Sequence, residues 1–179
     1  MGLFLLAGAA SLSAQDKFFT KSGKIIFYSK ATLENIEALN KAVTCVLDTK
    51  SGNMQFAVMM KAFEFEKALM QEHFNENYVE SHKYPKAEFK GQIVNNAEID
   101  YSKDGSYKAK VKGKLTLHGE TRDVETTGSV VVKGGKVETD AEFNIELADY
   151  KVEIPKVVKD NISKTVKITV DCNLEPLKG

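Results

Sequence analysis

The sequence lacks a net charge, because 25 Lys and Arg residues are balanced by 25 Asp and Glu residues. Long-range attraction to nucleic acid or to an anionic membrane surface requires an excess of basic residues, so charge favours neither partner. The chain also has no internal repeat, no low-complexity tract and no linker-like segment. Its 179 residues therefore predict one domain.

The motifs of hydrolases and metalloenzymes are missing as well. No two histidines have the i, i+4 spacing that binds zinc on a helix, and no Gly-x-Ser-x-Gly elbow occurs. There is no Gly-rich phosphate loop, and the acidic residues fall mostly on the outward faces of alternating strands rather than in a catalytic pair. The sequence therefore predicts no metal site, no cofactor and no catalytic residue.

Cysteine is scarce: Cys45 and Cys172 are the only two. Two cysteines cannot form a structural zinc site by themselves. In an oxidising compartment they would be able to form a disulfide, but cysteines in strand-like segments are often simply small buried side chains. The sequence leaves both interpretations open.

Residues 1–15 carry no charge, are apolar from Leu3 to Ala10 and end in small residues. This pattern is typical of a secretory signal peptide, and the apolar run is too short to span a bilayer. We expect cleavage near Ala14 or Gln15, a mature domain over residues 16–179 without a transmembrane segment, and a periplasmic or secreted location. No cysteine follows the apolar run, which argues against a lipid anchor.

The segment from Ser106 to Val124 is the most regular of the chain. Its first half alternates between two sets, Tyr107, Ala109, Val111, Gly113, Leu115 and Leu117 against Lys108, Lys110, Lys112, Lys114, Thr116 and His118. Alternation with period two predicts a β-strand with one face in water and the other in an apolar interior. Gly119 then allows a tight turn, and a second strand is expected from Thr121 to Lys133.

Similar patterns predict further strands along the rest of the chain. We expect them at Lys24 to Ala31 (extended back to Phe18 and interrupted at Ser22-Gly23), Ala42 to Asp48, Asn53 to Phe63, Lys86 to Asn95, Lys136 to Ala148 and Lys164 to Leu174. Thr32 to Asn40 has roughly helical spacing and predicts a short helix or compact loop, and Phe65 to Asn77 predicts an amphipathic helix.

This order predicts a mainly β fold: an antiparallel, lipocalin-like barrel of about eight strands with one or two short helices, since closure hides the edges of a sheet. Such a barrel is either filled by side chains or hollow enough for one small ligand. Small inward residues, Ala109, Gly113, Thr139 and Ala141, favour a cavity. The helix, or the Met and Phe side chains of residues 53–63, would be able to fill the same space, and the sequence does not decide between the two.

Three segments resemble the YceI-like family of exported bacterial lipid-binding barrels. Leu115 to Val124 (Leu-Thr-Leu-His-Gly-Glu-Thr-Arg-Asp-Val) is similar to the family's Leu-Thr-hydrophobic-His-Gly-x-Thr signature, and Tyr78 to Phe89 is similar to its Tyr-Pro segment. His73-Phe74 stands where members often have Arg-Asp-x-His-Leu, although Met70-Gln71 replaces the Arg-Asp. The resemblance covers roughly Lys17 to Leu174. It implies an apolar tunnel for a polyisoprenoid, an isoprenoid quinone or a fatty amide, and no chemistry on it; the missing Arg implies a less polar ligand end.

We therefore expect a non-catalytic protein that binds, sequesters or transports a long apolar lipid. The predicted ligand-binding residues are seven inward-facing side chains and two polar residues near the hairpin turn: Val111, Leu115, Ala141, Phe143, Ile145, Val166, Ile168, His118 and Arg122. Two alternatives remain: a lipid-modifying enzyme with His118 or His73 as base, and a solid-core structural or interaction barrel. Considered without the family resemblance, the three polar residues have simpler interpretations: His118 as a turn residue, Arg122 as a surface cation and His73 as a cation near a helix C-terminus.

Overall fold

The computed structural model describes residues 16–178; the predicted signal peptide, residues 1–15, lies outside the described residues. The strands are β1 (Lys17–Lys30), β2 (Asn35–Asp48), β3 (Asn53–Met59), β4 (Phe63–Phe65), β5 (Lys86–Ile93), β6 (Gly105–Leu117), β7 (Glu120–Lys133), β8 (Lys136–Glu146) and β9 (Thr165–Pro176). The helical segments are α1 (Ala68–His73) and the short turns η1 (Met60–Ala62), η2 (Phe74–Tyr78), η3 (Asn96–Glu98), η4 (Leu147–Tyr150) and η5 (Lys156–Val158). Among the described residues, no helix is long and apolar enough to cross a bilayer.

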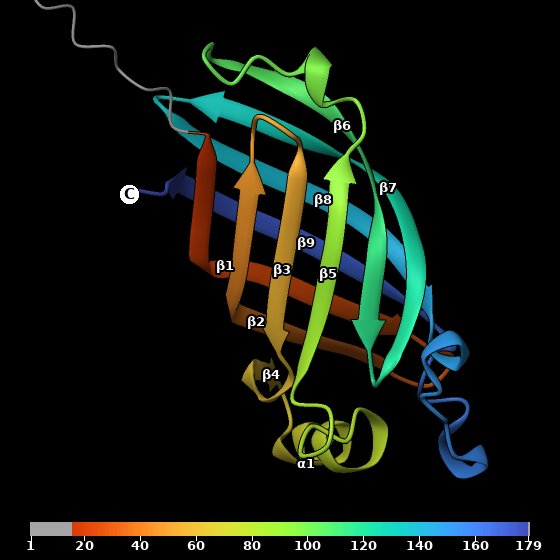
Figure 1. Ribbon diagram of the computed structural model, residues 1–179. Helices are drawn as coiled ribbons and strands as arrows, with labels where there is room; N and C mark the ends of the chain where they lie inside the picture. Colours follow the sequence, from red (N-terminus) through yellow and green to blue (C-terminus); the bar gives the residue numbers. More distant parts are fainter. Residues whose placement is uncertain (1–15, 179) are drawn as a thin grey trace, which may run out of the picture.

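The strands form one antiparallel sheet that closes on itself (Figure 1). The sheet order is β1-β9-β8-β7-β6-β5-β3-β2, and β1 also pairs with β2, which completes the ring; the three-residue β4 adds to the lower half of β2. Closure gives every strand of the ring two neighbours, so no strand of the ring is an edge strand over its whole length. The prediction of a mainly β, eight-stranded antiparallel barrel with a short helix is confirmed.

The β6–β7 hairpin forms a longer and more regular ladder than β1–β2, and it has the predicted alternation. Lys108, Lys110, Lys112 and Lys114 are exposed, whereas Ala109 on the other face is buried. His118 and Gly119 connect the strands with φ angles of 53° and 75°. Two consecutive positive φ angles define the two-residue turn whose twist matches that of the flanking strands, which explains the His-Gly sequence at this point.

Strand β1 bends where its pairing shifts around Gly23, as the predicted interruption suggested. Cys45 on β2 and Cys172 on β9 approach each other across this bend, and a Cβ on Gly23 would lie 2.6 Å from Sγ of Cys172. Both thiols are free and fully buried. A hydrogen bond to Cys172, together with burial, raises the pKa of the Cys45 thiol well above its ordinary value.

Two local predictions are wrong. Thr32 to Asn40 is not a helix or a compact loop, because β2 begins at Asn35 and pairs with β1 from there onward. The helix predicted from Phe65 to Asn77 begins only at Ala68, since Phe65 belongs to β4 and pairs with Ala38. After α1 the chain continues as the wider turn η2 to Tyr78.

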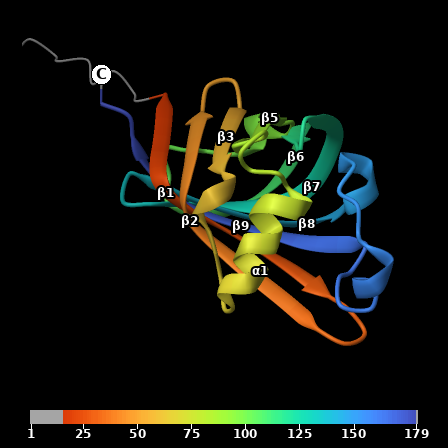
Figure 2. The same cartoon turned by 90° about the horizontal axis from the view of Figure 1, so that it is seen from below.

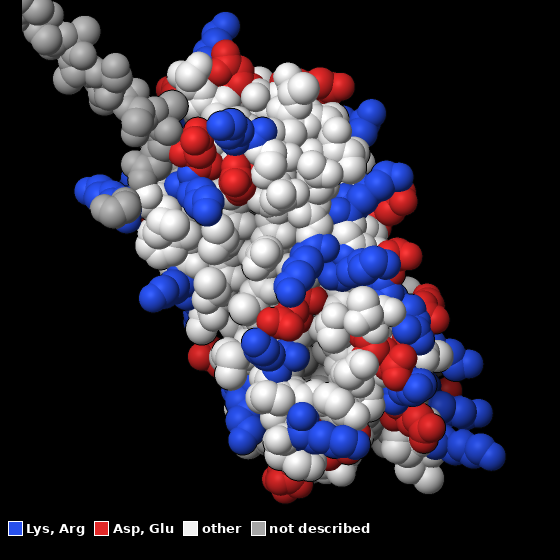
Figure 3. Space-filling model, in the orientation of Figure 1, with Lys and Arg blue, Asp and Glu red and all other residues white. Residues whose placement is uncertain are grey.

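One end of the barrel is packed solid and the other carries the helices. Side chains with no exposed surface fill the first end, namely Val43, Leu47, Val137 and Leu174. Seen from below, α1 lies across the opposite end, and the segment containing η4 and η5 lies beside it (Figure 2). On the face shown in Figure 3, Lys and Arg are interspersed with Asp and Glu, in agreement with the balanced composition.

Candidate functional site

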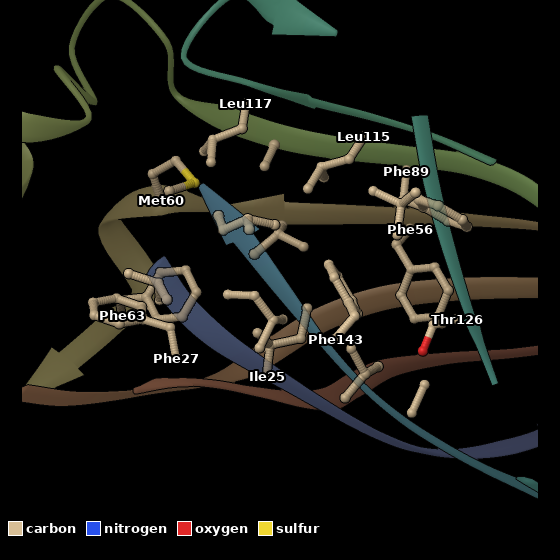
Figure 4. A pocket seen from close by; sticks show the side chains of 18 of the residues that line it. Ile25, Phe27, Phe56, Met60, Phe63, Phe89, Leu115, Leu117, Thr126 and Phe143 are labelled. Carbon is tan, nitrogen blue, oxygen red and sulfur yellow. The ribbon is translucent and has the colours of Figure 1, made fainter. Parts of the chain in front are cut away.

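Between its two ends the barrel encloses an apolar cavity of about 300 Å³. All eight strands of the ring contribute to its wall, and the side chains converge on one space (Figure 4). Prominent among the lining residues are aliphatic and aromatic side chains: Ile25, Phe27, Phe56, Met60, Phe63, Phe89, Leu115, Leu117 and Phe143. The interior is therefore hollow in this structure rather than solidly filled.

The seven inward-facing residues predicted from the sequence all line this cavity: Val111, Leu115, Ala141, Phe143, Ile145, Val166 and Ile168. They come together because β6, β8 and β9 each place alternate residues on the inner face. Ala109, Gly128 and Ala141 lie on neighbouring strands β6, β7 and β8, and their small side chains leave the space open. That these residues contact a ligand stays a prediction.

Other lining residues were not proposed as site residues from the sequence. Phe56 on β3 and Phe89 on β5 are register partners, and their rings meet edge to face with centroids 6.0 Å apart. The alternation of Met54, Phe56, Val58 and Met60 did indicate one common face. Alternation does not tell whether bulky side chains border a cavity or fill it, because that depends on the diameter of the closed barrel.

A cluster of four phenylalanines, which we call the Phe cluster, lies at the end of the cavity beneath α1. It comprises Phe27, Phe63, Phe65 and Phe74, and neighbouring ring centroids are 5.0 to 5.7 Å apart. Aromatic pairs at these distances add stabilisation beyond the burial of their area. The helix that carries Phe74 is therefore anchored to β1 and β4 by ring contacts.

Neither Lys nor Arg lines the cavity, and the histidine that does, His73, is exposed. The two carboxylates of the lining have partners elsewhere: Glu88 pairs with Lys86 at 3.0 Å, which lowers the Glu88 pKa, and the exposed Asp140 accepts a hydrogen bond from Ser129. Burial raises the pKa of Tyr78, so this phenol is neutral at ordinary pH. Such a lining can bury an apolar molecule, but it offers no buried Lys or Arg that would compensate an anionic one.

His118 lies outside the cavity lining, at the turn between β6 and β7. Its Nε2 is 2.6 Å from Oε2 of Glu80 and its Nδ1 is 2.9 Å from the carbonyl oxygen of Tyr150, while the ring of Tyr84 meets it edge-on. Both ring nitrogens are thus engaged by oxygen atoms of neighbouring segments. The hydrogen bond from His118 lowers the pKa of Glu80.

The remaining polar candidates are also outside the lining or at its margin. Arg122 is exposed and donates to the Thr121 carbonyl oxygen and, at 3.3 Å, to Glu120. His73 borders the cavity from α1 but is exposed. Over residues 16–178, no group of three or more His, Cys, Asp or Glu side chains is arranged to hold a metal ion.

The fold and the cavity define the class of protein: a closed eight-stranded β-barrel with a long apolar interior. The chain belongs to the YceI-like domain family, which it matches over residues 13–174.

Solved structures show the same fold. A polyisoprenoid-binding domain from Saccharophagus degradans, implicated in plant cell wall breakdown, superposes with a TM-score of 0.78 at 16% identity, over 91% of this chain and 99% of its own. BcnA of Burkholderia cenocepacia superposes with a TM-score of 0.70 at 19% identity, over 85% of this chain and 95% of its own. The Campylobacter jejuni YceI protein superposes with a TM-score of 0.52 at 19% identity, over 75% of this chain and 82% of its own. No curated protein sequence matches this chain.

Proposed function

We propose that this protein binds a long, electrically neutral lipid in the barrel and sequesters or transports it without chemical change. The observation that carries the proposal is the apolar cavity of about 300 Å³ without a lining Lys or Arg. The Saccharophagus degradans relative, described as a polyisoprenoid-binding domain, supports the same ligand class. A polyisoprenoid alcohol, an isoprenoid quinone and a fatty amide all fit, and an exported protein in the periplasm or outside the cell would meet them in or near membranes.

The size of the cavity sets how much of such a ligand is held. A cavity of about 150 Å³ accommodates one benzene ring, so about 300 Å³ accommodates roughly twelve carbon atoms. Burial of each methylene contributes about 0.8 kcal/mol. Affinity should therefore rise with tail length up to roughly twelve carbons and then level off, and the rest of a longer chain would lie outside.

The proposal excludes a catalytic role for the two histidines considered from the sequence. Both ring nitrogens of His118 are already engaged, by Glu80 and by the Tyr150 carbonyl oxygen, and the residue lies outside the cavity lining, so the ring is not placed to act as a base on a cavity ligand. His73 is exposed on α1.

The test uses two ligands with the same tail and different heads. Native mass spectrometry of protein purified without denaturation, followed by solvent extraction, should reveal a bound neutral lipid. In a competition assay with a pyrene-labelled dodecyl alcohol, farnesol should displace the probe and farnesyl diphosphate should be much weaker, because no Lys or Arg lines the cavity to pair with a buried diphosphate. Failure of the probe to bind lipid-free protein would refute the binding function, and equal displacement by the two competitors would refute the neutral head group.

A further inference from the structure

The wall of the barrel has a gap between the lower halves of β7 and β8. The two strands pair from Lys133 with Lys136 to Gly128 with Ala141, and the ladder stops there. Beyond that point residues 120–127 of β7 pair with β6 alone, and residues 142–146 of β8 pair with β9 alone. One side-chain hydrogen bond crosses the gap, from Oγ1 of Thr126 to the carbonyl oxygen of Glu142 at 2.8 Å.

The interrupted seam between β2 and β3, by contrast, is filled. Between β2 and β3 the ladder runs only from Thr44 to Leu47 of β2, but β4 pairs with β2 below it. There the buried amide of Asn40 donates to the carbonyl oxygen of Met59. No strand takes the corresponding place between β7 and β8 in the described part of the chain.

The gap has a defined frame, and we call it the β7–β8 window. At its upper corner the backbones approach so closely that a Cβ on Gly128 would collide with the carbonyl oxygen of Asp140. At its lower edge the η4 segment is tied to the β6–β7 turn by the hydrogen bond between His118 and the Tyr150 carbonyl oxygen and by the Lys151–Glu120 ion pair at 2.7 Å. The two strands are thus held together above and below an unpaired stretch.

The cavity reaches this window. Val124 and Thr126 from β7 and Phe143 from β8 line the cavity, and each is only partly buried. Figure 4 shows Thr126 and Phe143 directed toward the common interior space. The Phe cluster narrows the end beneath α1, where the partly exposed Met70, Val158 and Ile162 also line the cavity, and fully buried side chains close the opposite end.

The outer rim of the window suits an uncharged chain. Three of its carboxylates are paired with lysines: Asp123 with Lys114 at 2.7 Å, Glu125 with Lys112 at 3.0 Å and Glu142 with Lys167 at 3.5 Å. A fourth, Glu146, accepts a hydrogen bond from Thr165. The three ion pairs reduce the net field at the opening, which suits an uncharged tail.

We propose that lipids pass between the cavity and the outside through the β7–β8 window, with the part of a long chain that exceeds the cavity projecting between the two strands. This inference rests on the proposed lipid-binding function. Obstructing a passage changes the rate constants of uptake and release by the same factor, because the free energies of the bound and free states are unaltered. A change in the cavity lining instead changes the equilibrium affinity.

The experiment cross-links the two strands across the window and compares the cross-linked form of a double variant with an uncross-linked form of the same variant. Glu125 and Asn144, exposed on β7 and β8, are the positions that would face each other if the ladder continued, so E125C/N144C is reacted with a short bifunctional maleimide. The same double variant capped with N-ethylmaleimide is the unstapled control. The matched control is K112C/E125C, which staples β6 to β7 at a register pair and removes the same ion pair. The native cysteines are fully buried and protected from reaction in the folded protein.

Uptake of the pyrene-labelled dodecyl alcohol from phosphatidylcholine vesicles, and its release to excess unlabelled vesicles, are followed by stopped-flow fluorescence. The β7–β8 staple should slow both rates by about tenfold or more with the dissociation constant unchanged, because any other route requires local opening of packed structure. The β6–β7 staple should change neither rate. Equal exchange rates in the β7–β8-stapled and capped proteins would overturn the window as the passage, and loss of probe binding in the capped protein itself would count against the binding function instead.

Discussion

Replacing Ala141 with Phe tests whether the cavity is the binding space. Ala141 lies on the inner face of β8, lines the cavity and is partly buried. The added ring occupies about 150 Å³, as a bound benzene does, which is about half of the 300 Å³ available. Room for roughly twelve carbons would fall to about six, and the six lost methylene contacts, at about 0.8 kcal/mol each, amount to about 5 kcal/mol of binding free energy.

That loss corresponds to an affinity roughly three orders of magnitude lower, which titration with the pyrene-labelled alcohol would measure. The unfolding free energy, in contrast to the affinity, should not fall. In a densely packed interior the same substitution costs about 1–3 kcal/mol through overpacking, whereas a ring that enters an empty space buries itself and leaves the unfolding free energy equal or higher.

Glu138→Phe is the matched control, since it adds the same ring to the exposed face of the same strand and leaves the cavity untouched. Its affinity should equal that of the wild type. Should Ala141→Phe lower the melting temperature strongly while binding is unaffected, the interior would be a packed core and the reasoning from cavity volume would fail.

Three further predictions address the supports of the cavity. Phe74→Ala should lower the unfolding free energy measured in urea by about 3 kcal/mol, because it removes one ring from the Phe cluster. Leu69→Ala, at a 61% exposed site on the preceding helix α1, should change the unfolding free energy by less than about 0.5 kcal/mol. Equal losses in the two variants would contradict the anchoring of α1 by the Phe cluster. Protein purified and unfolded without reductant should release two reactive thiols from Cys45 and Cys172, and the folded protein none; no thiols after unfolding would mean that a bridge forms. Because the pKa of Glu80 is lowered in the folded protein, its stabilisation is present above the ordinary carboxyl pKa and is lost as pH falls through the lowered value. The excess stability of the wild type over Glu80→Gln should therefore shrink as pH falls below about 4.3, and a pH-independent difference would contradict the contribution of the hydrogen bond between Glu80 and His118.

Where one face of a strand is buried and the other solvated, the sequence was sufficient to predict the fold. The lysine-alternating row of β6 and the acidic alternation of β8 placed Val111, Leu115 and Phe143 on the inner face, and the structure has them there. Period-two alternation is a strong signal because a shift by one residue would expose the whole apolar set.

The start of β2 shows why other parts were not predictable. Asn40 stands in the inward row and is fully buried, which interrupts the alternation, but its amide is satisfied by the Met59 carbonyl oxygen and by the Ala42 N–H. Those partners are backbone groups, and the one from Met59 belongs to another strand, so they leave no trace in the local pattern. Phe65 likewise follows its pairing with Ala38 rather than its helical spacing.

The β7–β8 window escaped the sequence for a related reason. The alternation of β7 continues through Val124 and Thr126, so nothing in the residue pattern marks where pairing with β8 ends. The end of the ladder is a property of two strands together with the close approach at Gly128, and a single sequence reports neither.

The seam between the first and the last strand has a consequence for the order of folding. Phe18 pairs with Pro176, so the ring joins residues from opposite ends of the chain. Contacts at such separation form late, because the long intervening loop must be closed before they contribute. A growing chain that has not yet produced β9 can form the β1–β2 and β6–β7 hairpins, but it keeps an unpaired edge on β1 and another on β8. Until the final twelve-residue strand is added, those edges are open to pairing with other chains, and self-association is therefore a hazard of the unfinished protein rather than of the complete one.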